Sequence, residues 1–188
     1  QAWRPLEDPN NPHYNYYKNN HQYHAYNFPE IPSYDTIISA RDQWVKNNPD
    51  LKIIAAHILS MSNDIDAVAQ RLEAYPNLSV ELGARFGDLA MQDSDKVRNF
   101  FDKYQDRILF GTDYGTGEAE DQKSSEELLA EAKNLEERYQ LLFDYLTKQD
   151  SMVLRKQQTK GLALSKSVLE KIFSKNYLKF LKILFRIY

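Results

Sequence analysis

The spacing of hydrophobic positions between residues 33 and 115 predicts helices that alternate with short buried strands. Ser33 is expected to cap a helix whose apolar face holds Tyr34, Ile37, Ile38, Trp44 and Val45. Two further helices are expected near residues 65–75 and 94–104. Three short apolar runs are expected to be strands: 51–56, 78–82 and 107–111. This alternation predicts βαβ units with a parallel sheet, which is the α/β class.

The chain is interpreted as one domain over residues 1–188, with three segments. Residues 1–32 are rich in Pro, Asn and Tyr and are expected to form a long loop. Residues 33–115 hold the βα units, and residues 116–188 hold C-terminal helices joined by a polar stretch. Ser124 and Glu127 have the spacing of a capping box at the start of the first of these helices. Three parallel strands would leave a bare edge, which a partner or another part of the chain would have to cover.

Composition excludes several classes of protein. With 42% hydrophobic and 27% charged residues, the chain has a globular composition. The absence of cysteine excludes disulfides, thiolate metal sites and cysteine nucleophiles. A net charge of −3 argues against a general nucleic-acid binder, and no apolar run is long enough for a transmembrane helix. At 188 residues the chain is shorter than the roughly 250 of a closed eight-stranded α/β barrel. Because it begins with Gln1 and no signal-like run, we expect a fragment or a processed product.

Two residues with catalytic chemistry follow predicted strands. His57 comes directly after the first predicted strand. Asp113 comes two residues after the third, within the sequence FGTD. The carboxyl ends of parallel strands share one edge of a sheet, so the two side chains are expected to face one pocket. An imidazole there is a candidate general acid or base or a metal ligand, and a carboxylate is a candidate metal ligand. A structural histidine and a turn aspartate remain the alternatives.

Other polar residues give weaker signals. Arg85 follows the second strand and is a candidate clamp for a substrate carboxylate, with a surface arginine as the alternative. Glu81 is expected to point inward from that strand or simply to be a polar residue at its end. His21 and His24 have the spacing of a metal pair, but they lie in the predicted loop, where solvated side chains are the simpler interpretation.

Taken together, these segments resemble the C-terminal half of the amidohydrolase-related proteins, a family of metal-dependent TIM-barrel hydrolases and decarboxylases. The resemblance covers almost the whole chain in matching order, and the segment that ends in FGTDYG is its most specific part. The similar segments are QAWRPLEDPNN (1–11), ARDQWVKNNPDLKIIAAH (40–57), RLEAYPNLSVELGAR (71–85), FFDKYQDRILFGTDYG (100–115) and KGLALSKSVLEKIFSKN (160–176).

This resemblance implies a fold, a cofactor and roles for individual residues. The fold would be a (β/α)8 barrel, of which the chain supplies about strands 6–8, truncated at the N-terminus. His57 matches the family's strand-six histidine, which is catalytic or polarises the substrate. Asp113 matches the strand-eight aspartate, which contacts the metal and helps to activate water. The cofactor would be a divalent metal, with zinc as the first choice, and the partner a small-molecule substrate. The Tyr- and Asn-rich loop would be a lid-like insertion.

The chain also departs from the family pattern. The His-x-His pair of the first strand is absent, and the fifth-strand histidine would fall just before Gln1, so most metal ligands are expected outside this chain. Leu59 stands where a glycine is common. The leading prediction is hydrolysis of C–N or C–O bonds by metal-activated water in the parent protein, with this chain inactive alone. The alternatives are a decarboxylase, and a non-catalytic truncated barrel that acts through protein–protein contacts, including self-association.

Overall fold

The computed structural model describes residues 2–7, 9, 13–115 and 123–184. The chain forms two compact units, Gln1–Leu51 and Lys52–Tyr188. Parts of the sequence interpretation lie outside the described residues. They are parts of the first similar segment and the two ends of the predicted C-terminal segment: 1, 8, 10–12, 116–122 and 185–188.

The first unit consists of short helices. In order these are α1 (Tyr14–Asn19), η1 (His21–Tyr23), η2 (Ala25–Asn27) and α2 (Tyr34–Asn47). Helix α2 begins as predicted, because the Ser33 hydroxyl oxygen accepts a hydrogen bond of 3.1 Å from the Thr36 N–H. The predicted long loop before it contains three brief helical turns, each closed by local backbone hydrogen bonds.

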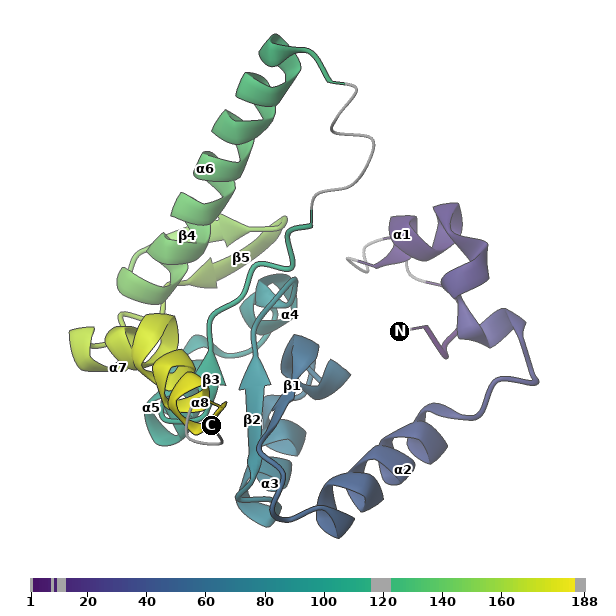
Figure 1. Ribbon diagram of the computed structural model, residues 1–188. Coiled ribbons are helices and arrows are strands. Elements are labelled where there is room, and N and C mark those ends of the chain that lie inside the picture. The colour runs from purple at the N-terminus through teal and green to yellow at the C-terminus, as the bar shows by residue number, and fades with distance from the viewer. Residues whose placement is uncertain (1, 8, 10–12, 116–122, 185–188) are drawn as a thin grey trace. The chain divides into compact units, whose positions relative to one another are not determined.

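The second unit contains a three-stranded parallel sheet in the order β1-β2-β3 (Figure 1). Its strands are β1 (Ile53–Ala55), β2 (Leu78–Glu81) and β3 (Ile108–Leu109). In the register, Ile53 pairs with Leu78 and Val80 pairs with Ile108. The first three residues of β2 are buried, as expected for a central strand covered on both faces. The predicted mixed α/β class with a parallel sheet is therefore confirmed, whereas the part of the chain that the structure describes does not close a barrel.

Short helices connect the three strands. They are α3 (Ile65–Ala74), α4 (Phe86–Ala90) and α5 (Ser94–Tyr104). Asp93 caps α5, because its carboxylate accepts a 2.8 Å hydrogen bond from the Lys96 N–H. The sequence did not predict α4. All five of its residues are buried, so no polar face marks it as a helix.

After β3 the chain forms a long helix and a β-hairpin. These elements are α6 (Ser125–Thr147), β4 (Ser151–Leu154) and β5 (Gln157–Lys160). The capping box predicted at Ser124 and Glu127 is confirmed in both directions. The hairpin corrects the interpretation of this stretch as a polar connection. Its residues are mostly polar because only Leu154 of the two strands is buried.

The last elements are α7 (Lys166–Glu170), the π-helical turn η5 (Lys171–Lys175) and α8 (Asn176–Leu184). They cover the β3 edge of the sheet (Figure 1). The Phe110 N–H donates to the Ile172 carbonyl at 3.0 Å, and the Asn176 side-chain amide donates to the Ile108 carbonyl at 2.7 Å. The chain's own C-terminal helices therefore cover one edge that the sequence left bare. No further strand follows β1 at the other edge among the described residues.

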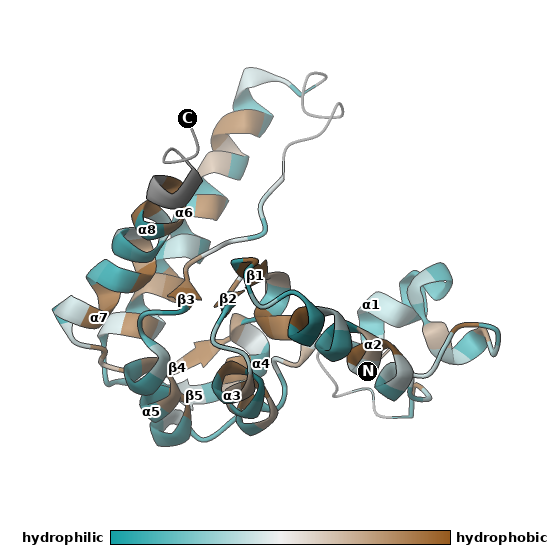
Figure 2. Ribbon diagram, turned by 60° about the horizontal axis from the view of Figure 1, so that its bottom comes forward, coloured by the Kyte–Doolittle hydropathy of each residue, from teal (hydrophilic) through white to brown (hydrophobic). Residues whose placement is uncertain are grey.

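The core of the second unit lies between the sheet and these helices. Figure 2 shows hydrophobic residues gathered in the strands and on the inward faces of the helices, with hydrophilic turns outside. Val80, Phe101 and Ile172 are among the side chains with no exposed surface. Burying such side chains supplies most of the stabilisation, at about 1.5–3 kcal/mol for each large one. This core fixes the strands whose carboxyl ends carry the candidate site.

Candidate active site

The carboxyl end of each parallel strand leads into left-handed backbone. His57 follows β1 with φ 56°, Ala84 follows β2 with φ 57°, and Asp113 follows β3 with φ 58°. None of these residues is glycine, and left-handed backbone costs other residues about 1–2 kcal/mol each, less for Asp and His. Strained backbone of this kind concentrates at functional sites, and parallel sheets bind ligands at this edge. The edge is therefore the candidate active site.

His57 opens a complete left-handed turn. Residues 57–60 all have φ between 52° and 60°. Ile58 and Leu59 within the turn are 0% and 3% exposed, so their burial offsets the strain of the backbone. Leu59, where the resemblance leads us to expect a glycine, itself adopts φ 60°. The turn is thus held by side chains that anchor it in the core.

The imidazole of His57 is held by the loop after β2. Its Nδ1 lies 2.9 Å from the Gly83 carbonyl oxygen. Because a carbonyl oxygen only accepts, Nδ1 carries the hydrogen, and the lone pair of the neutral ring lies on Nε2. That Nε2 lies 3.9 Å from Asp113 Oδ1, and the two side chains are 30% and 54% exposed. The structure thus brings His57 and Asp113 together with their reactive atoms open to solvent.

Glu81, the last residue of β2, connects the His57 turn to the loop after β2. Its carboxylate accepts hydrogen bonds from the Gly83 N–H at 2.5 Å and from the His57 N–H at 3.4 Å. Two glycines make room for it. A Cβ at Gly111 would lie 1.6 Å from Glu81 Oε1, and one at Gly83 would lie 2.6 Å from it. The sequence had left Glu81 between an inward residue and a simple polar strand end. The glycine that follows each of the strands β2 and β3 was the available signal.

Tyr177 of α8 approaches the same carboxylate from the C-terminal helices. Its hydroxyl donates to the Phe110 carbonyl at 2.5 Å. Burial raises the pKa of Tyr177, and the negative charge of Glu81 raises that pKa further. The phenol is therefore neutral at physiological pH. No sequence signal indicates this neighbour, because Tyr177 and Glu81 are distant in the chain.

Arg85, the third candidate from the sequence, lies at the start of α4. Its Nε is inaccessible to solvent and has no hydrogen-bond partner among the described residues. The structure does not bring it into contact with His57 or Asp113. It lies two residues after Gly83, which places it at the same edge of the sheet.

The two histidines of the first unit do not form a metal pair. His24 is 3% exposed, and one of its ring nitrogens lies 2.8 Å from the Arg4 carbonyl oxygen. Its ring stacks on Tyr17 and Tyr26 at centroid distances of 5.5 and 5.7 Å. His24 is therefore a packed structural residue, while His21 is exposed at the start of η1.

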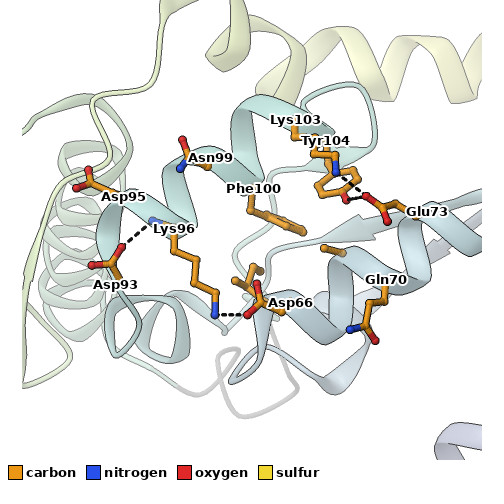
Figure 3. A pocket seen from close by; sticks show the side chains of 12 residues that line it. Asp66, Gln70, Glu73, Asp93, Asp95, Lys96, Asn99, Phe100, Lys103 and Tyr104 are labelled. Carbon is orange, nitrogen blue, oxygen red and sulfur yellow. Dashed lines mark hydrogen bonds and ion pairs between the residues drawn. The ribbon is translucent and has the colours of Figure 1, made fainter.

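A groove of about 540 Å³ lies between α3 and α5, away from these residues. Two lysines of α5 point toward carboxylates of α3 (Figure 3). Lys103 donates to Glu73 at 2.5 Å, and Lys96 pairs with Asp66. Exposed pairs of this kind contribute little free energy and leave no charge free for chemistry. The groove therefore does not compete with the sheet edge as the catalytic centre.

A family model described as amidohydrolase matches residues 28–183. The match spans most of the chain and includes the sheet, both carboxyl-edge residues and the C-terminal helices. The chain belongs to the amidohydrolase family. This confirms the resemblance inferred from the sequence and supports a hydrolase-like or decarboxylase-like function in general. No curated protein and no solved structure matches the chain.

Amidohydrolases are generally metal-dependent, so the side chains at the candidate site can be compared with the ligands that a metal would need. His57 Nε2 and Asp113 Oδ1 are of the right chemical type and face each other. Among the described residues, however, no three His, Asp or Glu side chains come together as metal ligands. Catalytic zinc sites usually take three protein ligands. The part of this amidohydrolase that the structure describes therefore does not by itself complete a metal centre.

The helices of this amidohydrolase give no candidate for a membrane span. Within residues 2–7, 9, 13–115 and 123–184, none combines the length and the apolar character needed to cross a bilayer.

Proposed function

We propose that the protein hydrolyses C–N or C–O bonds of a small-molecule substrate at the His57–Asp113 pair. The observation that supports this most directly is the 3.9 Å separation of His57 Nε2 and Asp113 Oδ1, with the histidine tautomer fixed by the Gly83 carbonyl. Hydrolysis requires a group that removes a proton from the attacking water and returns it to the leaving group. An exposed carboxylate beside an oriented imidazole suits that task.

Each residue has a separate role in this proposal. Asp113 takes the proton from water and delivers it to the leaving nitrogen or oxygen. His57, held through Nδ1, positions the substrate carbonyl and polarises it when Nε2 carries a proton. Glu81 keeps the His57 turn and the Gly83 loop in register through its two accepted hydrogen bonds. Arg85 binds a negatively charged group of the substrate.

We propose zinc as the cofactor and Asp113 as one of its ligands. When bound, a divalent metal supplies a Lewis acid that activates water and stabilises developing negative charge. The described residues provide too few donors to hold it alone, so the remaining ligands would come from elsewhere. In the roles proposed above, His57, Glu81 and Asp113 act through their own side chains.

Two asparagine substitutions test the proposal without straining the backbone. Asn adopts left-handed φ readily, so Asp113→Asn and His57→Asn change the chemistry at φ 58° and φ 56° but not the turns. Turnover of the full-length protein is measured on a panel of amides, lactones and aromatic carboxylic acids, and its bound metal is measured by mass spectrometry. We expect Asp113→Asn to lower kcat by about 100-fold or more and to reduce the metal content.

Asp102→Asn is the matched control, because Asp102 is exposed on α5 and outside the site. It should retain wild-type turnover and metal content. Release of carbon dioxide instead of a hydrolysed product would identify the decarboxylase alternative. Wild-type turnover and metal content in Asp113→Asn would show that the assignment is wrong.

A further inference from the structure

A second group of charged side chains surrounds α4 at the same edge of the sheet. Arg85 directly precedes this helix, and Asp88 lies within it. Arg155 belongs to the turn between β4 and β5, a hairpin that packs against α4 (Figure 1). Elements distant in sequence therefore meet at α4 and bring charged side chains with them.

The conformation of Arg155 is unusual for its place in the fold. Arg155 and Lys156 are the two residues of the hairpin turn, with φ 48° and 69°. Such turns favour Asn-Gly or Asp-Gly, because both positions need left-handed backbone. An arginine at this position is strained, whereas Asn or Gly would form the same turn with less strain. The presence of arginine is therefore explained better by what its side chain contacts than by what the backbone of the turn needs.

Gly87 makes the place for that side chain. A Cβ at Gly87 would lie 3.1 Å from Arg155 Cδ and 3.5 Å from Arg155 Cβ. Glycine inside a helix costs about 1 kcal/mol relative to alanine. Gly87 and Arg155 are each unfavourable for the local backbone in which they occur. Together they allow the aliphatic part of the Arg155 side chain to lie along the backbone of α4.

The charges around Arg155 are predominantly positive. Burial by nearby protein atoms lowers the pKa of Arg155, Arg138 of α6 and Arg85 lower it further, and Asp88 opposes them. Asp88 is 8% exposed and already accepts a 2.6 Å hydrogen bond from the Ser62 hydroxyl. Arg155 therefore feels two other guanidinium charges but only one carboxylate, and that carboxylate has another hydrogen bond, so positive charge is in excess around Arg155.

Arg85 adds an unsatisfied donor to this excess. Its Nε–H is buried and has no hydrogen-bond partner in the described part of the chain. A buried donor without a partner costs about 1–3 kcal/mol, and more when it is charged. Guanidinium groups bind the two oxygens of a carboxylate or phosphate side by side. An oxyanion would therefore satisfy both the free donor and the excess charge.

We infer that Arg85, Arg138 and Arg155 form an oxyanion-binding site for a carboxylate or phosphate group. The Gly83 carbonyl that holds His57 lies two residues before Arg85, so this site and the proposed catalytic pair share one edge of the sheet. The oxyanion is then the non-reacting end of the substrate. That last step rests on the proposed function, whereas the oxyanion site itself does not.

Direct binding to the intact protein tests this site without an activity assay. Inorganic phosphate and malonate are titrated at constant ionic strength, and binding is measured by calorimetry and by the NMR resonances of arginine Nε–H groups. We expect saturable binding with a shift of the Arg85 Nε–H. Arg155→Gln and Arg138→Gln should each weaken it by about tenfold.

Lys156→Gln is the matched control, because it removes one positive charge from the same two-residue turn. It should weaken binding by less than about twofold, as expected for a charge without a fork of donors. Saturation by malonate identifies a carboxylate site, and saturation by phosphate alone identifies a phosphate site. Equal losses in Arg155→Gln and Lys156→Gln, or replacement of both probes by chloride, would overturn the inference.

Asp113→Asn separates the two proposals. It should lower kcat by about 100-fold or more and leave oxyanion binding intact, and wild-type turnover with intact binding would refute only the proposed function.

Discussion

The carboxyl edge of the parallel sheet and the groove between α3 and α5 belong to the same βα units, but they place charged groups differently. In the groove, Lys103 and Lys96 each pair with an acid, and both helices have carboxylate caps. At the carboxyl edge, His57 and Asp113 stand 3.9 Å apart on left-handed backbone. One region satisfies its polar groups locally, and the other holds them in strained positions.

This difference indicates where the fold is arranged for function. Local rules such as capping and ion pairing lower the free energy of the groove, and nothing there needs a ligand. The sheet edge breaks local rules at three strand ends and stays in place because buried side chains and Glu81 hold it. Backbone strain that the hydrophobic core maintains is expected at a site where a bound substrate completes the interactions of the polar groups.

The largest effect is expected from Gly111→Ala at the carboxyl edge. The backbone at Gly111 is not left-handed, so the main obstruction to alanine is its nearest neighbour, Glu81, whose Oε1 would lie 1.6 Å from the new Cβ. The carboxylate must move and lose its hydrogen bonds to Gly83 and His57. We expect a loss of about 1–3 kcal/mol in the free energy of unfolding, measured by urea denaturation, together with a fall in kcat.

Gly115→Ala is the control, because a Cβ at Gly115 would have no atom of the described residues within 4 Å. It should be close to wild type. A double-mutant cycle with Glu81→Ala sharpens the test, since most of the cost of Gly111→Ala should disappear once Glu81 is gone. If that cost persists in the Glu81→Ala background, Glu81 is not the cause.

The same substitution should have opposite signs in the two regions. Ala84→Gly relieves left-handed strain at φ 57°, which exceeds the entropy that glycine adds to the unfolded chain. We expect stabilisation of up to about 1 kcal/mol. Ala69→Gly lies inside α3 beside the groove and should destabilise by about 1 kcal/mol.

Urea denaturation of both variants gives the two differences, and equal m-values would show that the same surface unfolds. Destabilisation of similar size in both variants would mean that Ala84 carries no strain. The contrast between the two regions would then rest on the remaining left-handed residues alone.

The positions of the strands and two helix caps could be predicted from the sequence because both depend on local patterns. The predicted strands 51–56 and 107–111 contain β1 and β3, which are shorter than predicted, and the Ser33 and Ser124 caps form as expected. Placing His57 and Asp113 at one edge required only parallel strands in a single sheet. Their catalytic and metal-binding roles, and that of Arg85, remain predictions.

Long-range contacts explain what the sequence did not reveal. The left-handed turn after β1 contains no glycine and is maintained by the burial of Ile58 and Leu59. The role of Glu81 depends on space left by Gly111, which is distant in sequence. Coverage of the β3 edge depends on the π-helical turn, which directs the Ile172 carbonyl to Phe110. None of these has a local pattern of hydrophobic or polar residues.

The smallest effect is expected from Glu73→Gln in the groove. The hydrogen bond from Lys103 lowers the pKa of Glu73, and a 2.8 Å hydrogen bond from Tyr104 adds to this. A lowered carboxyl pKa contributes stability above its ordinary value of 4.5, and that contribution disappears as the pH falls through the lower folded-state value. Wild type should therefore be slightly more stable than Glu73→Gln at pH 7 and indistinguishable from it in strong acid or high salt.

Urea denaturation at several pH values measures this difference, with Glu137→Gln on the exposed surface of α6 as the control. A difference that stays constant with pH would show that Glu73 acts through packing and not through its charge, and the groove would then be less like an ordinary solvated surface than its ion pairs indicate.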